Sequence, residues 1–239
     1  MINCCKAVGF IFKKEDRSEA DKILSVFTEE FGSIKIFAKA IRKITSKLKS
    51  GIDIFSASEI EFVQGKTKKT LTDAIFIKKF NNIIASPKRF KIANEIAKVL
   101  NDFIKEQHPD KKIFDLLIDA FDKLNNKFLK ETDCILIYYY FFWNFCFIIG
   151  FRPELQKCAD CFGELKSDEV YFSSKDGGII CPKCFNSNTA IKVNSDVVKI
   201  LRLILKKDWQ IISKLKFNLN SQKLLHQITN NYYAYLLDK

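Results

Sequence analysis

Four cysteines occur as two pairs, and their spacing is that of a metal site. Each pair has the form Cys-x-x-Cys, and nineteen residues separate the two pairs. A pair of thiolates at this spacing can bind one ion, and two pairs supply the four ligands of a closed tetrahedral Zn²⁺ centre. Four sulfur ligands leave no position open for water, so we expect a structural zinc rather than a catalytic one. The predicted ligands are Cys158, Cys161, Cys181 and Cys184.

Chance spacing and a pair of disulfides are the alternatives to a zinc site. The segment between the pairs contains the turn Asp176-Gly177-Gly178, so it can fold back as a hairpin and bring the pairs together. The amino-terminal residues have no secretory signal pattern. The longest apolar run, residues 134–149, has 16 residues, which is short of the roughly 20 that a membrane span needs. We therefore expect a cytoplasmic protein without a membrane partner, where paired cysteines more often bind metal than form disulfides.

The second candidate site is a basic segment. The chain carries 40 basic and 28 acidic residues, a formal charge of +12, which favours polyanionic partners such as nucleic acid or an anionic membrane surface. Residues 31–52 hold six basic residues and no acidic one, and a second cluster, Lys66, Lys68 and Lys69, lies at a predicted hairpin tip. Lysines that follow a phosphate backbone, with an aromatic ring for base stacking, are typical of single-strand binding. The candidate DNA-binding residues are Lys35, Phe37, Lys39, Arg42, Lys43 and Lys47.

This basic segment has a simpler interpretation as well. A lysine-rich composition can merely keep a protein in solution, and a lysine face is commonly just solvated. Phe37 can likewise be a half-buried packing residue. Charge alone does not separate these interpretations from DNA binding.

The elements that must carry these residues change in type along the chain. Alternating patterns predict strands at 6–12, 23–31, 33–39, 58–63 and 70–77, which suggests a small closed or nearly closed barrel. Beyond Phe80 the apolar period becomes helical, and Ser86-Pro87 has the form of a helix start. We predict an α+β protein with a barrel domain at 1–80, a mainly helical domain at 81–150 and 188–239, and a metal module at 151–187 inserted into the helices.

Residues suited to catalysis are sparse. The chain has two histidines, His108 and His226, and neither lies near a cysteine pair or an acidic cluster. It has no phosphate-binding glycine loop and no nucleophile elbow. We therefore expect a binding protein and not an enzyme. A zinc-dependent nuclease or hydrolase is a weaker hypothesis, because it needs an open metal position.

Several of these motifs together resemble one family. The run Gly150-Phe-Arg-Pro-Glu-Leu155 precedes the first cysteine pair, and Gly177-Gly178-x-x-Cys181-Pro-x-Cys184 forms the second. Residues 19–43 are similar to the second and third barrel strands and the following basic segment of the same family, and residues 51–65 to its fourth strand region. In this order the motifs resemble the bacterial DNA repair protein RecO family, over nearly the whole chain.

The resemblance implies an N-terminal OB-fold barrel, a helical domain with an inserted zinc module, and a recombination mediator that is not an enzyme. Such proteins bind single- and double-stranded DNA and anneal complementary strands. With RecR, and in some systems RecF, they help load RecA onto DNA covered by single-stranded-DNA-binding protein, so a cytoplasmic protein associated with the nucleoid is expected. The resemblance assigns Lys39, Arg42, Lys43 and Lys47 to phosphate contact.

The chain departs from the family pattern at Ala40, where a glycine is common, so the conformation of the loop there is an open question. The alternative function is a non-catalytic adaptor. Its basic surface, or a groove in the helical domain, would then bind acidic protein tails without functional DNA contact. Competition between an acidic peptide and DNA would separate shared from distinct binding sites.

Overall fold

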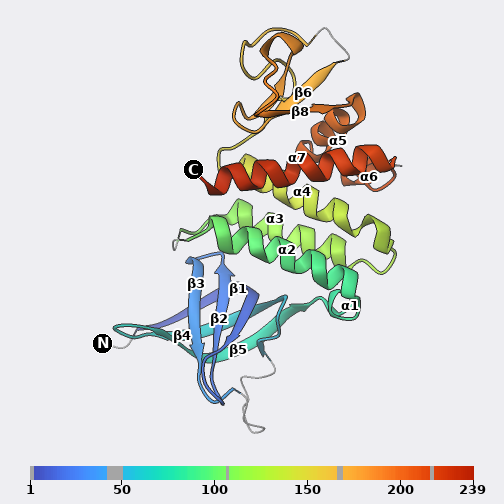
Figure 1. The fold of residues 1–239 in the computed structure, drawn as a ribbon. Helices are drawn as coiled ribbons and strands as arrows, with labels where there is room; N and C mark the ends of the chain where they lie inside the picture. Colours follow the sequence, from blue (N-terminus) through green and yellow to red (C-terminus); the bar gives the residue numbers. More distant parts are fainter. Residues whose placement is uncertain (1–2, 42–50, 106–107, 166–168, 216–217) are drawn as a thin grey trace. The chain divides into compact units, whose positions relative to one another are not determined.

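A computed structural model describes residues 3–41, 51–105, 108–165, 169–215 and 218–239. The chain divides into two compact units, residues 1–134 and 135–239. The first unit holds the barrel and the helices that follow it, and the second holds the remaining helices and the cysteine module (Figure 1). The α+β class predicted from the sequence is confirmed. The assignment of 81–150 and 188–239 to one helical domain stays a prediction.

The first unit begins with a closed five-stranded barrel in the order β1-β2-β3-β5-β4. Its strands are β1 (Asn3–Asp16), β2 (Lys22–Thr28), β3 (Gly32–Ala38), β4 (Ser56–Gln64) and β5 (Lys69–Lys79). Neighbouring strands are antiparallel except β3 and β5, which close the barrel through a short parallel pairing. Gly32 makes the β2–β3 turn with a φ of +65°, a conformation that glycine adopts without steric cost.

The barrel core follows from alternation along the strands. In β3 the side chains of Ile34, Ile36 and Ala38 are buried while Lys35 is exposed, because successive side chains alternate between the two faces of a strand. Ile34, Ile36 and Ala38 join apolar side chains from the other four strands in one buried cluster. The barrel therefore has an apolar interior of its own.

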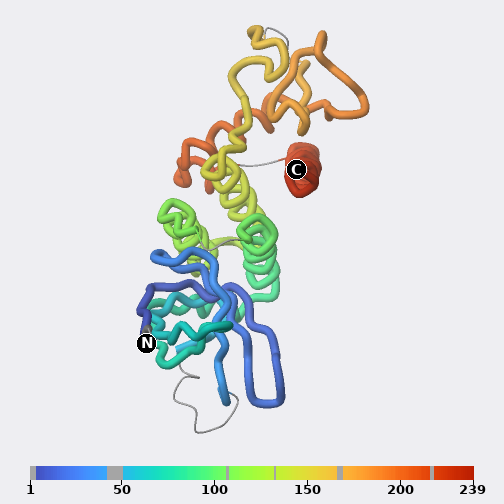
Figure 2. The backbone as a smooth tube through the Cα atoms, turned by 90° about the vertical axis from the view of Figure 1, so that its left-hand side faces the viewer, coloured from blue at the N-terminus to red at the C-terminus, as the bar shows by residue number. Residues whose placement is uncertain are grey.

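Among the described residues of the first unit, three α-helices follow the barrel, α1 (Asn81–Ile84), α2 (Pro87–Phe103) and α3 (Lys111–Asn125), and then a 3₁₀ turn, η2 (Glu131–Asp133). The backbone views place α2 and α3 together at one end of the barrel (Figure 2). The helix start predicted at Ser86-Pro87 is confirmed, with the Ser86 hydroxyl accepting from the Arg89 N–H. Phe121 of α3 lies 4.5 Å from Phe10 of β1 between ring centroids, so an aromatic contact joins helix and barrel.

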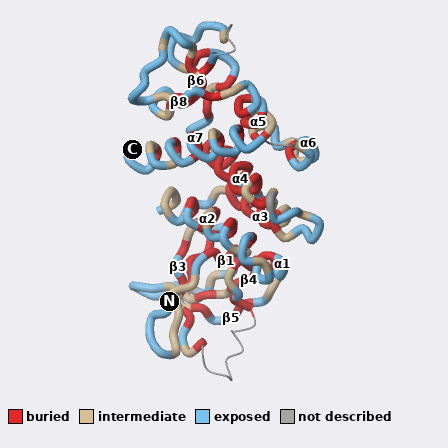
Figure 3. Tube along the Cα trace, turned by 45° about the vertical axis from the view of Figure 1, so that its right-hand side comes forward, coloured by how far each residue is buried: buried red, intermediate tan, exposed pale blue. Residues whose placement is uncertain are grey.

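The second unit is built on α4 (Cys134–Ile148), which begins at the boundary between the units. This helix is apolar around its circumference, and it is buried along most of its length (Figure 3). Its Trp143 stacks on Tyr232 of α7 (Leu219–Leu237) and donates to Thr229 at 3.2 Å. Its Asn144 donates to the Ile204 carbonyl of α5 (Ser195–Leu205). The shorter α6 (Trp209–Ile212) connects α5 to α7.

The cysteine module lies in the chain between α4 and α5. It contains a three-stranded antiparallel sheet in the order β7-β6-β8, made of β6 (Val170–Ser173), β7 (Gly178–Ile180) and β8 (Ala190–Val193). Phe172 of β6 meets Trp143 edge-on at 5.6 Å, which attaches the sheet to α4. Across the described ranges, no helix combines the length and apolar character needed to cross a membrane.

Candidate metal centre and nucleic-acid interface

Two tight turns present the cysteines. In the first, the Cys158 N–H donates to the Gly163 carbonyl at 2.9 Å, and the Phe162 N–H donates back to the Cys158 carbonyl at 3.0 Å. In the second, a single 3₁₀ turn, η3 (Pro182–Cys184), follows Cys181, and the Cys184 N–H donates to the Cys181 carbonyl at 3.1 Å. Both turns fold a Cys-x-x-Cys pair locally, and the hairpin between β6 and β7 then brings the pairs together.

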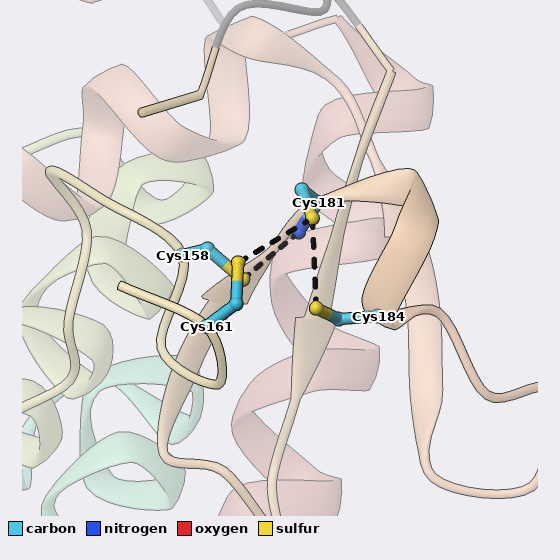
Figure 4. Close-up of side chains that lie close together, drawn as sticks. All are labelled: Cys158, Cys161, Cys181 and Cys184. Atoms are coloured by element: carbon cyan, nitrogen blue, oxygen red, sulfur yellow. Dashed lines mark hydrogen bonds between the residues drawn. The ribbon is translucent and has the colours of Figure 1, made fainter. Parts of the chain in front are cut away.

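The four sulfur atoms converge on one point (Figure 4). They lie within 4.8 Å of one another, with Cys161 and Cys181 at 4.0 Å and Cys181 and Cys184 at 3.6 Å. A disulfide needs an S–S distance of about 2 Å, so the cysteines are free thiols and the disulfide alternative is wrong. Tetrahedral Zn–S bonds of about 2.3 Å separate neighbouring sulfurs by about 3.8 Å, and the two shorter distances fit that value.

The environment of the sulfurs favours a bound cation. Burial opposes ionisation of Cys158, but N–H groups of Cys181, Cys161 and Asp160 direct hydrogen bonds at its sulfur and together lower its pKa to about 6. Cys184 behaves oppositely, because the Asp160 carboxylate and the neighbouring thiols raise its pKa. Four thiolates cannot crowd together without a compensating positive charge. The donor set therefore fits a metal ion that would be held by all four cysteines.

The candidate nucleic-acid interface is a groove in the first unit. We call it the lysine groove. It has a volume of about 620 Å³ and is lined from β3, the β4–β5 turn and the end of α2. None of its described lining residues is acidic. Its basic residues are Lys35, Lys66, Lys68, Lys69 and Lys105.

The structure brings together some of the predicted DNA-binding residues and not others. Lys35 lines the lysine groove. Phe37 is half-buried, and the Lys68 ammonium lies 4.4 Å from its ring centroid, so the ring belongs to the edge of the same surface. Lys39 is exposed just beyond β3 but does not line the groove. Three further predicted residues lie outside the described residues: Arg42, Lys43 and Lys47.

Sequence reasoning missed the contribution of α2. Asn101, Ile104 and Lys105 line the groove from the end of this helix, although the chain separates them from Lys35 by more than sixty residues. The available signal was weak, because Lys105 is a single lysine after a helix that the pattern did predict. The hairpin-tip lysines, noted from the sequence as a separate cluster, prove to belong to the same groove as Lys35.

The backbone at Ala40 shows which conformation the loop adopts where the family commonly has a glycine. Its φ is +51°, in the left-handed region that favours glycine. Its N–H donates to the Asp21 carboxylate at 2.8 Å, which holds the turn in place. The turn therefore keeps a glycine-type conformation although the residue is alanine.

Fold and site together define a class: an α+β protein with a closed N-terminal barrel, a helical C-terminal part and a cluster of four cysteines that could hold a metal ion. Comparison with known families agrees. Residues 1–80 match the family model described as recombination protein O N terminal, and residues 85–239 match recombination protein O C terminal. The chain belongs to the RecO family.

Individual relatives are named DNA repair protein RecO. A DNA repair protein RecO from Dehalococcoides mccartyi is 36% identical over 213 residues, which cover 89% of this chain and 83% of that one. The one from Alkaliphilus metalliredigens is 28% identical over 235 residues, covering 98% and 94%. Family membership supports a role in DNA repair and recombination.

Proposed function

We propose that this protein is a recombination mediator that binds single- and double-stranded DNA and anneals complementary strands. Together with RecR it helps load RecA onto DNA coated by single-stranded-DNA-binding protein, with RecF taking part in some systems. The proposal includes no catalysis, and it places the protein in the cytoplasm, associated with the nucleoid. The supporting observation is the lysine groove, whose five lysines face no acidic lining residue within the described part of the chain.

The mechanism is electrostatic. Lysines displace condensed counterions from DNA phosphates, so affinity falls as salt rises. Two strands held on a basic surface repel each other less, which lowers the barrier to pairing. Phe37 offers an aromatic face at the groove edge for one base, and Lys68, which lies over that ring, is placed to follow the phosphate. Arg42, Lys43 and Lys47, which follow β3 in sequence, belong to the same proposed contact.

The metal in this proposal is Zn²⁺ with a structural role. It would be held by Cys158, Cys161, Cys181 and Cys184, and a bound ion would tie the two turns of the module together. All four positions are then taken by sulfur, so the centre supplies no site for an activated water.

The first test is the salt dependence of DNA binding. The variant combines Lys35→Gln, Lys66→Gln and Lys68→Gln, all at exposed groove positions. If each lysine neutralises one phosphate, the slope of log K against log salt for a single strand becomes shallower by about 2. The matched control removes three exposed charges of the same unit outside the groove, Lys91→Gln, Lys112→Gln and Lys127→Gln. A folded groove variant with unchanged affinity and slope would reject this interface.

The second test separates the mediator from an adaptor for acidic tails. Complementary oligonucleotides are coated with single-stranded-DNA-binding protein, and annealing is followed with and without RecR. A mediator raises the rate, and the groove variant loses that increase. An adaptor binds the coat protein but leaves the annealing rate at its uncatalysed value in both forms.

A further inference from the structure

A second basic pocket lies in the second unit, next to the cysteine module. We call it the Arg152 pocket. It has a volume of about 370 Å³, and four basic side chains line it: Arg152, Lys157, Arg202 and Lys206. Within the described residues none of the four forms an ion pair. Three of them are exposed, and Arg202 is half-buried.

The pocket retains a positive charge despite one carboxylate in its wall. The Glu154 side chain accepts from the backbone N–H groups of Gln156 at 2.7 Å and of Lys157 at 3.4 Å. These bonds, with the Gln156 N–H first, and the nearby charge of Lys157 lower the pKa of Glu154, so the carboxylate is ionised and balances part of one of the four cations. Arg202 donates through Nε and Nη2 to the Leu155 carbonyl, which leaves its Nη1 group for another acceptor. Four cations against one occupied carboxylate make this an anion site.

Exposed aromatic rings accompany the cations. Arg152 lies 5.2 Å from the ring of Phe147, which is 45% exposed, and Lys157 lies 5.2 Å from the ring of Phe162, which is 68% exposed. Phe162 also has a φ of +60°, in the left-handed region that disfavours a phenylalanine. Exposing an apolar ring to water and holding its backbone in the left-handed region both cost free energy. Neither packing nor backbone preference therefore explains a phenylalanine at this position.

We propose that the Arg152 pocket and the rings of Phe147 and Phe162 form a second binding surface for single-stranded nucleic acid. The cations contact phosphates, and the rings stack on bases. The inference rests on the proposed function and extends it, because annealing needs two strands and this surface lies in a different unit from the lysine groove. Interleaved cations and exposed rings favour a nucleic acid over an acidic peptide, which would use the cations alone.

The test first replaces three lysines of the lysine groove. In the Lys35→Gln, Lys66→Gln, Lys68→Gln background, residual binding of a labelled thymidine oligonucleotide is measured by anisotropy with the full, zinc-loaded chain. Adding Arg152→Glu and Lys206→Glu lowers the residual affinity about tenfold or more. The control with the same charge change, Lys214→Glu and Lys223→Glu on exposed positions of the same unit, changes it less than about twofold.

Phe162→Gly separates stacking from structure. Glycine relieves the left-handed backbone, so the melting temperature of the protein stays constant or rises, whereas a structural role for the ring would lower it. Affinity for the thymidine strand falls about fivefold or more, and affinity for an abasic strand of equal length is unchanged. The matched control is Phe128→Gly, which removes another exposed ring with a lysine over it, in the first unit.

The outcomes are distinguishable. If the unmutated protein binds no DNA, the proposed function fails. If it binds DNA through the lysine groove but the pocket variants behave as their controls, only the second surface is refuted. A polyglutamate peptide that binds the pocket more tightly than the oligonucleotide would also refute it, in favour of an acidic protein partner.

Discussion

The barrel and the cysteine module position their candidate functional residues in different ways. The barrel has a buried apolar cluster with members from all five strands, and its lysines lie on the outside of that finished scaffold. The module has three strands of three or four residues, and its cysteines are placed by two local turns. So small a sheet has little core to stabilise it. We infer that the barrel owes its shape to apolar packing, whereas the module would depend on a metal ion held by its four cysteines.

Metal removal tests this comparison with the largest expected effect. A structural zinc in so small a module contributes about 10 kcal/mol of apparent stability at neutral pH. A chelator, or Cys181→Ser, should therefore raise hydrogen exchange throughout 151–193 while exchange in β1–β5 stays slow. Exchange mass spectrometry gives the measurement. Equal loss of protection in the barrel would break the comparison, since the first unit would then also depend on the metal.

Truncation of a buried apolar side chain should destabilise the barrel more than a matched truncation destabilises the cysteine module. Phe62 is fully buried in β4, and Phe62→Ala removes a large side chain from the centre of the barrel cluster. We expect a loss of about 3–5 kcal/mol in the free energy of unfolding, measured with urea. The matched change in the module is Phe185→Ala, at a ring that is 41% exposed, and it should cost less than about 1.5 kcal/mol. Equal costs would argue that the module has an apolar core after all.

A buried arginine makes polar contacts between two helices of the first unit. Arg89 is 7% exposed and donates to the carbonyls of Leu124, Asn126 and Leu129, so it joins α2 to the end of α3. Arg89→Met leaves these buried acceptors without their donor and should cost about 3 kcal/mol. Lys88→Met is the control, because Lys88 is exposed and its ion pair with Glu131 is screened by solvent, so the change in stability should be small. Thermal unfolding of both variants decides whether polar contacts supplement the apolar core.

The smallest effect concerns the left-handed turn after β3. Ala40→Gly relieves the steric cost of a φ of +51° but gives the unfolded chain more freedom, so stability should rise by roughly 0.5–1 kcal/mol. Ala38→Gly, two residues earlier in an extended strand, should lower stability. A destabilised Ala40→Gly variant would mean that the alanine methyl group makes a contact that outweighs the strain.

Local patterns predicted much of this fold. The alternation of Ile34, Lys35 and Ile36 predicts a strand with one buried face, and Ser86-Pro87 predicts the start of α2. The cysteine spacing predicts the cluster, because each Cys-x-x-Cys turn forms from neighbours in the chain. The lysine groove was only partly predicted. Lys35, Lys66 and Lys68 were recognised as basic residues, but as two separate patches, and Lys105 was not recognised at all.

The sequence alone therefore determined the strand pattern, the basic character of the chain and the clustering of the four cysteines, because these depend on period, composition and short spacing. Tertiary structure decided which cations share a surface. Closure of the barrel places β3 beside β5, and packing of α2 carries Lys105 to Lys35. Such proximity between residues far apart in the chain comes from the burial of apolar faces, and no local pattern around a lysine encodes it.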